Sequence, residues 1–312
     1  MAVDHISEAE FLEAPPRVSE WRRFRRVFFQ RGLVIFGLVV LLLLLFTAIF
    51  ADDWFIAVFQ GRDARPLLAP HDPYRGNLAD SLAQPSRQYL LGTDLQGRDA
   101  LSRLIFGART ALLVGFVTVA LASTAGSTLG LIAGHFEGVI GVIIMRVMDA
   151  LMGFPMLLLA LVVAAVLGSG IHNVIIALSI ATLPGYARTM YGLTLSIREN
   201  DYILAQRAMG ASSLRIVAGH ILPNALPPMI VLVTLQLGTL ILAEAGLSFL
   251  GIGIKPPGAA WGAMVLDGSR YLLTHPVLSI APGLAIMLVV FAFNMVGDGL
   301  RDALDPRLRG LL

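Results

Sequence analysis

Few side chains in this sequence have a type and a setting that could support chemistry. The strongest candidates are ionisable residues that interrupt apolar stretches, because a charge at membrane depth is costly and marks a functional hypothesis by default. Arg146 and Asp149 lie three residues apart, so on a helix they share a face and can neutralise each other. They form either a structural pair that locks this helix to a neighbour or part of a gate. Glu244, near the end of a later apolar stretch, is placed to face a polar path.

Residues for covalent or metal chemistry are poorly arranged. Ser248 lies in Gly-Leu-Ser-Phe-Leu-Gly, which is not the Gly-x-Ser-x-Gly nucleophile elbow, and the nearest histidine, His275, lies at an unsuitable depth for a base. The chain has no cysteine, its histidines lack ligand-like spacing, and no Gly-x-x-x-x-Gly-Lys-Ser/Thr loop for ATP occurs. We therefore predict no catalytic residue, no metal and no cofactor in this chain.

A different kind of site is indicated by the polar segment 198–223, RENDYILAQRAMGASSLRIVAGHILP, which lies between two apolar runs. Its first part has the pattern of a short helix, and Gly210 can turn the chain. Ser212 or Ser213 can then cap a second short helix that ends before Pro223. This pattern favours a loop that a partner grips from the aqueous side. The residues expected to be contacted are Asp201, Ala205, Arg207, Ala208, Met209, Gly210, Ala211, Ser212 and Pro223.

The composition predicts an all-α integral membrane protein. Hydrophobic residues make up 56% and charged residues 14% of the 312, whereas a soluble domain carries about a quarter charged residues. The apolar runs are continuous rather than alternating, which argues against strands. One run, 150–187, supplies two crossings if Gly168-Ser169-Gly170 is a turn, so six transmembrane helices are expected. The apolar runs are 32–51, 110–134, 150–187, 221–243 and 271–297.

Arginine density predicts the orientation. Arginines crowd in just before the first span, so the N-terminus is expected in the cytoplasm, and six crossings return the C-terminus to the same side. The pI near 9.2 reflects this asymmetry and not a nucleic-acid partner. The N-terminal arginines are Arg17, Arg22, Arg23, Arg25, Arg26 and Arg31. The expected parts are a cytoplasmic tail at 1–31 with an interfacial helix, a first helix at 32–51, an extracytoplasmic segment at 52–100, a five-helix core at 101–300 and a cytoplasmic tail at 301–312.

Three smaller features predict local structure. Asp94, Arg98, Asp99 and Arg103 can pair with one another, either as a salt-bridge cluster that anchors the second helix or in direct contact with substrate. Trp261 follows a proline-containing loop and suits a membrane–water boundary. Phe154-Pro155 is expected to kink the third helix.

The polar segment resembles the EAA loop of bacterial ABC importer permeases, which reads Glu-Ala-Ala, three residues, Gly, nine residues, then Ile-x-Leu-Pro. The matching residues are Ala205, Gly210, Leu222 and Pro223, and the departures are Leu204, Gln206 and His220. Three further stretches, 91–110, 244–264 and 294–309, resemble the second permease subunit of dipeptide, oligopeptide, glutathione and nickel importers.

This resemblance implies a type I ABC importer permease in the bacterial inner membrane that imports short peptides or peptide-like solutes. It implies pairing with a homologous second permease subunit, two cytoplasmic ATP-binding subunits that hold ATP and Mg, and an extracytoplasmic substrate-binding protein. Two alternatives remain at this point. One is an ion-gradient-driven secondary transporter, which should show repeated halves with broken helices, and the other is an intramembrane hydrolase built on Ser248.

Overall fold

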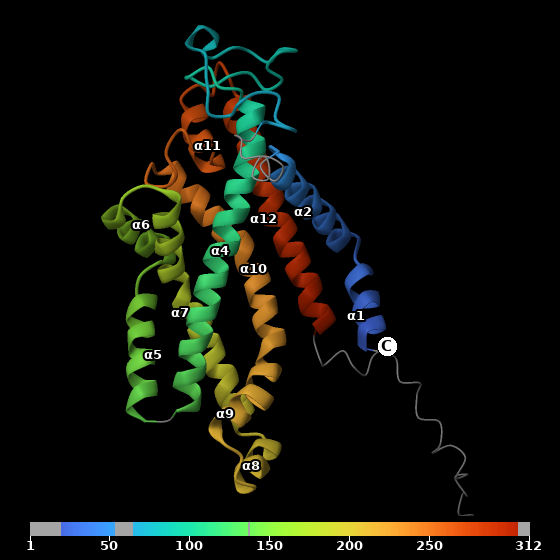
Figure 1. The fold of residues 1–312 in the computed structure, drawn as a ribbon, viewed down its shortest axis with the longest axis vertical. Helices are drawn as coiled ribbons and strands as arrows, with labels where there is room; N and C mark the ends of the chain where they lie inside the picture. Colours follow the sequence, from blue (N-terminus) through green and yellow to red (C-terminus); the bar gives the residue numbers. More distant parts are fainter. Residues whose placement is uncertain (1–19, 54–64, 137, 305–312) are drawn as a thin grey trace, which may run out of the picture.

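The computed structural model describes residues 20–53, 65–136 and 138–304. Within these ranges the regular structure is helical and no β-strand is formed. The predicted positions Arg17, Arg307 and Arg309 lie outside the described residues. In chain order (Figure 1) the helices are α1 Glu20–Phe29, α2 Gly32–Phe50, the 3-10 turn η2 Leu78–Asp80, α4 Ala100–His135, α5 Val139–Met152, α6 Met156–Leu167, α7 Ile171–Arg198, α8 Asp201–Ala208, α9 Ser213–Ile216, the π-helical turn η3 Val217–Ile221, α10 Leu222–Phe249, α11 Trp261–Ser269 and α12 Val277–Leu304.

Several of these helices can cross a bilayer. Among the described residues, α2, α4, α12 and the continuous stretch Ser213–Phe249 are each long and apolar enough, and α5 with α6 qualifies as one bent pair. The predicted class, an all-helical membrane protein, is therefore confirmed. α7 is 28 residues long but has Pro184 in its interior and is not among these candidates, so six crossings stay a prediction.

The two predicted breaks in the third apolar run are present. α5 and α6 are bent by 91° relative to each other at Phe154-Pro155, where proline removes a backbone donor and restricts the preceding residue. Gly168 and Gly170 both have positive φ and turn the chain from α6 into α7. The kink and the turn are confirmed because both depend on local backbone chemistry.

The closest helix pair in the molecule is α4 with α7. Gly126, Gly130 and Gly134 form a row along one face of α4, and all three are buried. A Cβ added at Gly126 would lie 2.6 Å from the carbonyl oxygen of Leu183, and one at Gly134 would lie 2.7 Å from Cβ of Thr194. This row of small residues lets the two backbones pack in direct contact, as in other membrane helix pairs.

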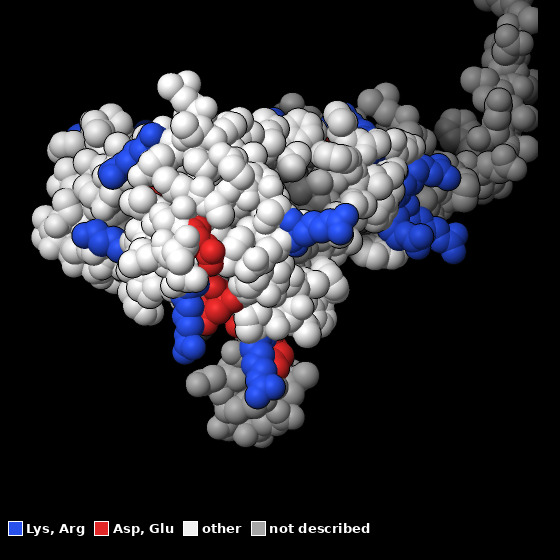
Figure 2. Space-filling view, turned by 90° about the horizontal axis from the view of Figure 1, so that it is seen from above, with Lys and Arg blue, Asp and Glu red and all other residues white. Residues whose placement is uncertain are grey.

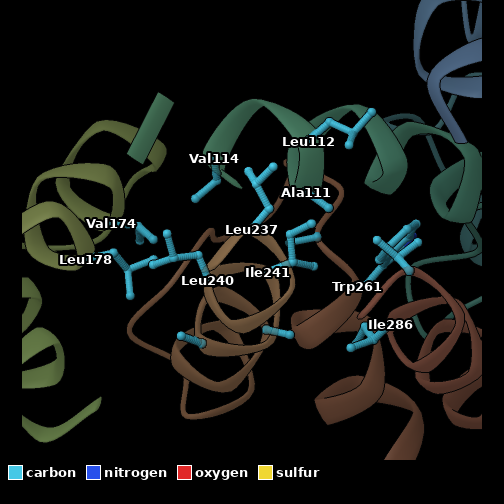
Figure 3. Close-up of a cluster of buried hydrophobic side chains, with 14 of the residues drawn as sticks. Ala111, Leu112, Val114, Val174, Leu178, Leu237, Leu240, Ile241, Trp261 and Ile286 are labelled. Atoms are coloured by element: carbon cyan, nitrogen blue, oxygen red, sulfur yellow. The ribbon is translucent and has the colours of Figure 1, made fainter. Parts of the chain in front are cut away.

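The main hydrophobic core lies where α10 meets α4 and α7. Figure 3 shows Val114 of α4, Val174 and Leu178 of α7 and Leu240 of α10 pointing toward one another, and all four are buried. Trp261 of α11 joins the same cluster. The side chain of Trp261 is buried, and its indole nitrogen donates to the carbonyl of Leu104 at 2.9 Å; its place at the membrane–water boundary stays a prediction.

The molecule has two distinct ends. α8 and α9 lie at one end, called here the α8 end, while residues 65–99 and α11 lie at the other, the α11 end (Figure 1). α1 packs beside the C-terminal end of α12, where Arg31 pairs with Asp302 at 2.7 Å. Seen from the α11 end, most of the surface is uncharged, and acidic side chains gather between scattered basic ones (Figure 2). The polar segments are thus divided between the two ends as expected.

A buried polar cluster holds the α11 end together. Arg98 pairs with Asp94 at 2.7 Å, and Arg103 lies 3.5 Å from the same carboxylate. Arg103 also donates to the carbonyls of Pro73 at 3.1 Å and Gly258 at 3.2 Å. The anchoring interpretation is therefore supported over substrate contact, because Arg103 is almost fully buried. Asp99 departs from the expected pairing and caps α4 instead, accepting from the Ser102 backbone at 3.0 Å.

Candidate functional site

The polar segment 198–223 folds as a small platform at the α8 end, held by one internal anchor. Ile203 is the single buried residue of α8, and its exposed fraction is 0%. It belongs to a cluster with Ile197 of α7, Ile216 of α9 and Ile221 of η3. Because α8 has eight residues and helices of that length are marginal in isolation, this anchor is what attaches α8 to the transmembrane helices.

The turn after α8 forms as the glycine predicts. Gly210 has φ +78°, its N–H donates to the carbonyl of Arg207 at 2.9 Å, and the N–H of Ala211 donates to that of Gln206 at 3.0 Å. These two bonds define a Schellman motif, in which a left-handed residue satisfies the last carbonyls of a helix. Ser212 then caps α9 by accepting from the backbone of Arg215. The helix–glycine–helix pattern is therefore present.

The second helix of the platform does not end before Pro223, so that expectation is wrong. α9 runs through the π-helical turn η3 directly into α10, and Pro223 occupies the first turn of α10. Proline is tolerated within this continuous element because the π-helical turn η3, directly before Leu222 and Pro223, already interrupts the regular α-helical hydrogen-bond ladder. As a result, Ser213–Phe249 forms one continuous element of 37 residues that connects the platform mechanically to the core.

The exposed surface of the platform carries apolar side chains together with the charged residues Asp201, Arg207 and Arg215. Tyr202 and Leu204 are exposed on α8, and beyond it Met209 is 71% and Leu214 77% exposed. Ala205 and Ala208 are also exposed on α8, and their side chains are small. Exposed apolar groups gathered at one polar-rimmed end are typical of a protein–protein contact.

The segment by which the chain enters the platform is tied to α4 and α7. Arg198, the last residue of α7, donates to the carbonyl of Gly134 near the end of α4 at 3.1 Å. The side chain of Asn200 donates to the carbonyl of Ile197 at 2.9 Å and so satisfies the end of α7. A displacement of α8 would therefore be transmitted to three long helices: α4, α7 and α10.

The predicted pairing of Arg146 with Asp149 is wrong. Asp149 on α5 forms its ion pair with Arg188 on α7, and both Asp149 and Arg146 are exposed in this chain rather than buried. The expected pair shared one helix face, but α5 packs against α7, which brings a guanidinium 39 residues away within reach of the carboxylate. Sequence reasoning missed Arg188, which directly follows the apolar run 150–187 but lies within α7 in the structure.

Glu244 lies inside the chain rather than on an open path. Its exposed fraction is 2%, and its carboxyl oxygen Oε1 accepts a hydrogen bond of 2.6 Å from Ser248 Oγ. The same hydroxyl accepts from the backbone N–H of Ile254 at 3.2 Å. Ser248 therefore ties the end of α10 to the following loop, and its bonds are those of a structural hydroxyl.

These features define a class of protein before any relative is considered. The chain is a multi-pass helical membrane protein in which a polar platform at one end is joined to the long helices α7 and α10. The model of the family described as binding-protein-dependent transport system inner membrane component matches residues 126–310, and the N-terminal TM domain of oligopeptide transport permease C matches residues 19–85. The chain belongs to the family of binding-protein-dependent transport system inner membrane components, and is thus a permease subunit of an ABC importer.

Similar proteins extend over nearly the whole chain. The dipeptide transport system permease protein DppC of Alkalihalophilus pseudofirmus is 40% identical over 292 residues, covering 94% of this chain and 91% of the relative. The glutathione transport system permease protein GsiD of Escherichia coli O157:H7 is 42% identical over 291 residues, covering 93% and 90%. The probable D,D-dipeptide transport system permease protein DdpC of Escherichia coli K12 is 37% identical over 307 residues, covering 98% of each.

A solved structure shows the same fold. The MetNI methionine ABC transporter in inward-facing conformations contains a chain that superposes with a TM-score of 0.51 at 20% identity, covering 64% of this chain and 96% of that one. These findings support the permease interpretation over both alternatives, the secondary transporter and the hydrolase.

Proposed function

We propose that this chain is one of two homologous membrane-spanning subunits of an importer for short peptides or peptide-like solutes. In this proposal it crosses the bacterial inner membrane six times, with both termini and the α8 end in the cytoplasm. A substrate-binding protein delivers the solute at the α11 end. Two cytoplasmic ATP-binding subunits hold ATP and Mg and supply the energy, while this chain performs no catalysis and carries no cofactor. The peptide class comes from the relatives, which are permeases of dipeptide and glutathione transport systems.

The observation that carries the proposal is the build of the platform. α8 presents exposed apolar side chains outward, while Ile203 is fully buried on its inner side. A partner seated on the outer face would therefore push on a helix that cannot slide freely, and α10 begins in the same platform. Closure of the ATP-binding subunits would then tilt the long helices as a rigid-body transition between two arrangements.

The test is reconstitution of the complete importer. The second permease subunit, the ATP-binding subunits and this chain should purify together, hydrolyse ATP faster when the loaded binding protein is added, and accumulate labelled dipeptide in proteoliposomes. Uptake driven by an ion gradient without ATP, or no peptide uptake in the assembled complex, would refute the proposal.

A pair of matched variants tests the platform itself. Met209→Asp introduces a charge at an exposed position of the platform and should release the ATP-binding subunits during purification. Leu273→Asp is the control, because Leu273 is fully exposed and lies beyond α11 at the opposite end of the molecule. Equal retention of the ATP-binding subunits by both variants would place the docking surface elsewhere.

A further inference from the structure

An ion pair lies on the surface of this chain at a depth where charges are costly. Asp149 is 11 residues from the start of the α5 segment at Gly138, and Arg188 is 10 residues from the end of α7. At about 1.5 Å per helical residue, each lies roughly 15 Å from the α8 end of its helix, about half the thickness of a hydrocarbon core. Asp149 thus lies within the apolar α5–α6 pair and Arg188 within α7, helices that the proposed function places across the membrane.

This pair is open to its surroundings in the single chain. The side chains of Arg188 and Asp149 are 52% and 43% exposed. Gly185 and Gly192 lie on the same face of α7, and nothing lies within 4 Å of a Cβ added at either. The exposed residue Arg146 lies one helical turn from Asp149, so a second cation borders the pair and the adjacent surface of α7 is open.

Lipid is an unsuitable neighbour for such a surface. Charged side chains within membrane spans almost always face the protein interior or a water-filled cavity, and they mark pathways. The apolar residues on the opposite face of α5, Ile140 and Val147, are also exposed and suit lipid or a partner subunit. The face that carries Arg146 and Asp149 is the one suited to water or substrate.

We propose that Asp149 and Arg188 form a subsite for the two charged termini of a zwitterionic peptide, the ammonium on Asp149 and the carboxylate on Arg188. This inference rests on the proposed function. Each terminus replaces one half of the resident ion pair, so the charge of the site is unchanged when the solute enters and when it leaves. Such an exchange holds the solute weakly, which is what a path requires because a tight site would stop passage. The occupant chemistry follows from the relatives, since dipeptides and glutathione carry both an ammonium and a carboxylate.

The experiment uses the complete reconstituted importer and three labelled forms of one dipeptide: free, N-acetylated and C-amidated. Each form is first loaded on the binding protein and its loading measured, so that uptake rates compare permease variants on the same delivered solute. Arg188→Gln should lower uptake of the free dipeptide about tenfold, the scale of one lost charge-assisted hydrogen bond, and leave the C-amidated form within about twofold of wild type. Asp149→Asn should show the converse preference and spare the N-acetylated form.

Matched controls separate a substrate role from a structural one. Arg301→Gln removes an exposed guanidinium at the end of α12 and should leave uptake of all three forms unchanged. The double variant Asp149→Arg with Arg188→Asp restores an ion pair with reversed polarity, and we expect its uptake of free dipeptide to stay as low as in the single variants. Full recovery in the double variant, or equal losses for all three peptide forms in the single ones, would overturn the subsite. Absence of uptake by the wild-type complex with every form would instead refute the proposed function.

Discussion

The attachment of α8 through one side chain leads to the sharpest prediction. Ile203 is fully buried and is the single buried residue of α8. Replacing it with alanine removes three carbon atoms from a closed cluster, and such changes cost about 2–5 kcal/mol when the cavity cannot collapse. A loss of about 3 kcal/mol corresponds to more than a hundredfold shift in an equilibrium. Because α8 is too short to persist alone, the cost is expected to appear as local detachment of the platform.

The assay measures coupling and local order in the same preparation. In Ile203→Ala complexes we expect basal ATP hydrolysis to remain, while its stimulation by loaded binding protein and peptide uptake both fall at least tenfold. Hydrogen exchange of backbone amides in residues 201–216 should accelerate, whereas α4 and α10 should keep their protection.

The adjacent residue provides the control. Leu204 is exposed, so Leu204→Ala should leave hydrogen exchange of the platform unchanged and weaken only retention of the ATP-binding subunits. If Ile203→Ala keeps full stimulation, full uptake and wild-type exchange, the platform is not held by this anchor and the argument fails.

Three further predictions follow from the same geometry. Gly210→Val forces a β-branched residue into φ +78°, which costs about 1–3 kcal/mol of local conformational free energy. The variant should insert but lose the stimulation of ATP hydrolysis by loaded binding protein. Normal stimulation would contradict the role of this turn. Gly126→Leu drives a side chain into the backbone of α7, and overpacking of this kind costs about 1–3 kcal/mol or more. The melting temperature of the purified subunit should therefore fall. An unchanged melting temperature would show that the α4–α7 contact is looser than in this structure. The chain has no cysteine, so single cysteines can be labelled without background. Ser86→Cys and Ser269→Cys should react with an impermeant thiol reagent on intact cells, and Ser213→Cys should not. Labelling at position 213 would show that the chain has the opposite orientation in the membrane.

Features set by local backbone chemistry were predictable from the sequence. The turn at Gly168–Gly170, the kink at Phe154-Pro155 and the turn at Gly210 all appear where glycine or proline requires them. The glycine row 126–130–134 on α4 is a small-xxx-small motif, a local pattern that favours close packing against another helix. In each case the signal lies within a few residues of the structure that it produces.

Pairings between distant segments were not predictable in the same way. Arg146 is the nearest cation to Asp149 along the chain, but the structure selects Arg188, and the indole nitrogen of Trp261 donates to a carbonyl of α4. Glu244 is similar, because the hydrogen bond with Ser248 and the enclosure around it depend on how α10 packs. A side chain takes its partner from the helices around it, and a single sequence does not state which helices those are.

By itself the sequence determined that this protein is helical, lies in a membrane, and carries a capped helix–glycine–helix segment between apolar spans. These properties follow from hydropathy, periodicity and the conformational limits of glycine and proline, which act over one or two helical turns. The tertiary structure alone decided that Ile203 anchors α8, that α9 continues into α10, and that Asp149 meets Arg188. These properties depend on long-range packing, in which small differences in buried surface and backbone approach select one helix neighbour over another.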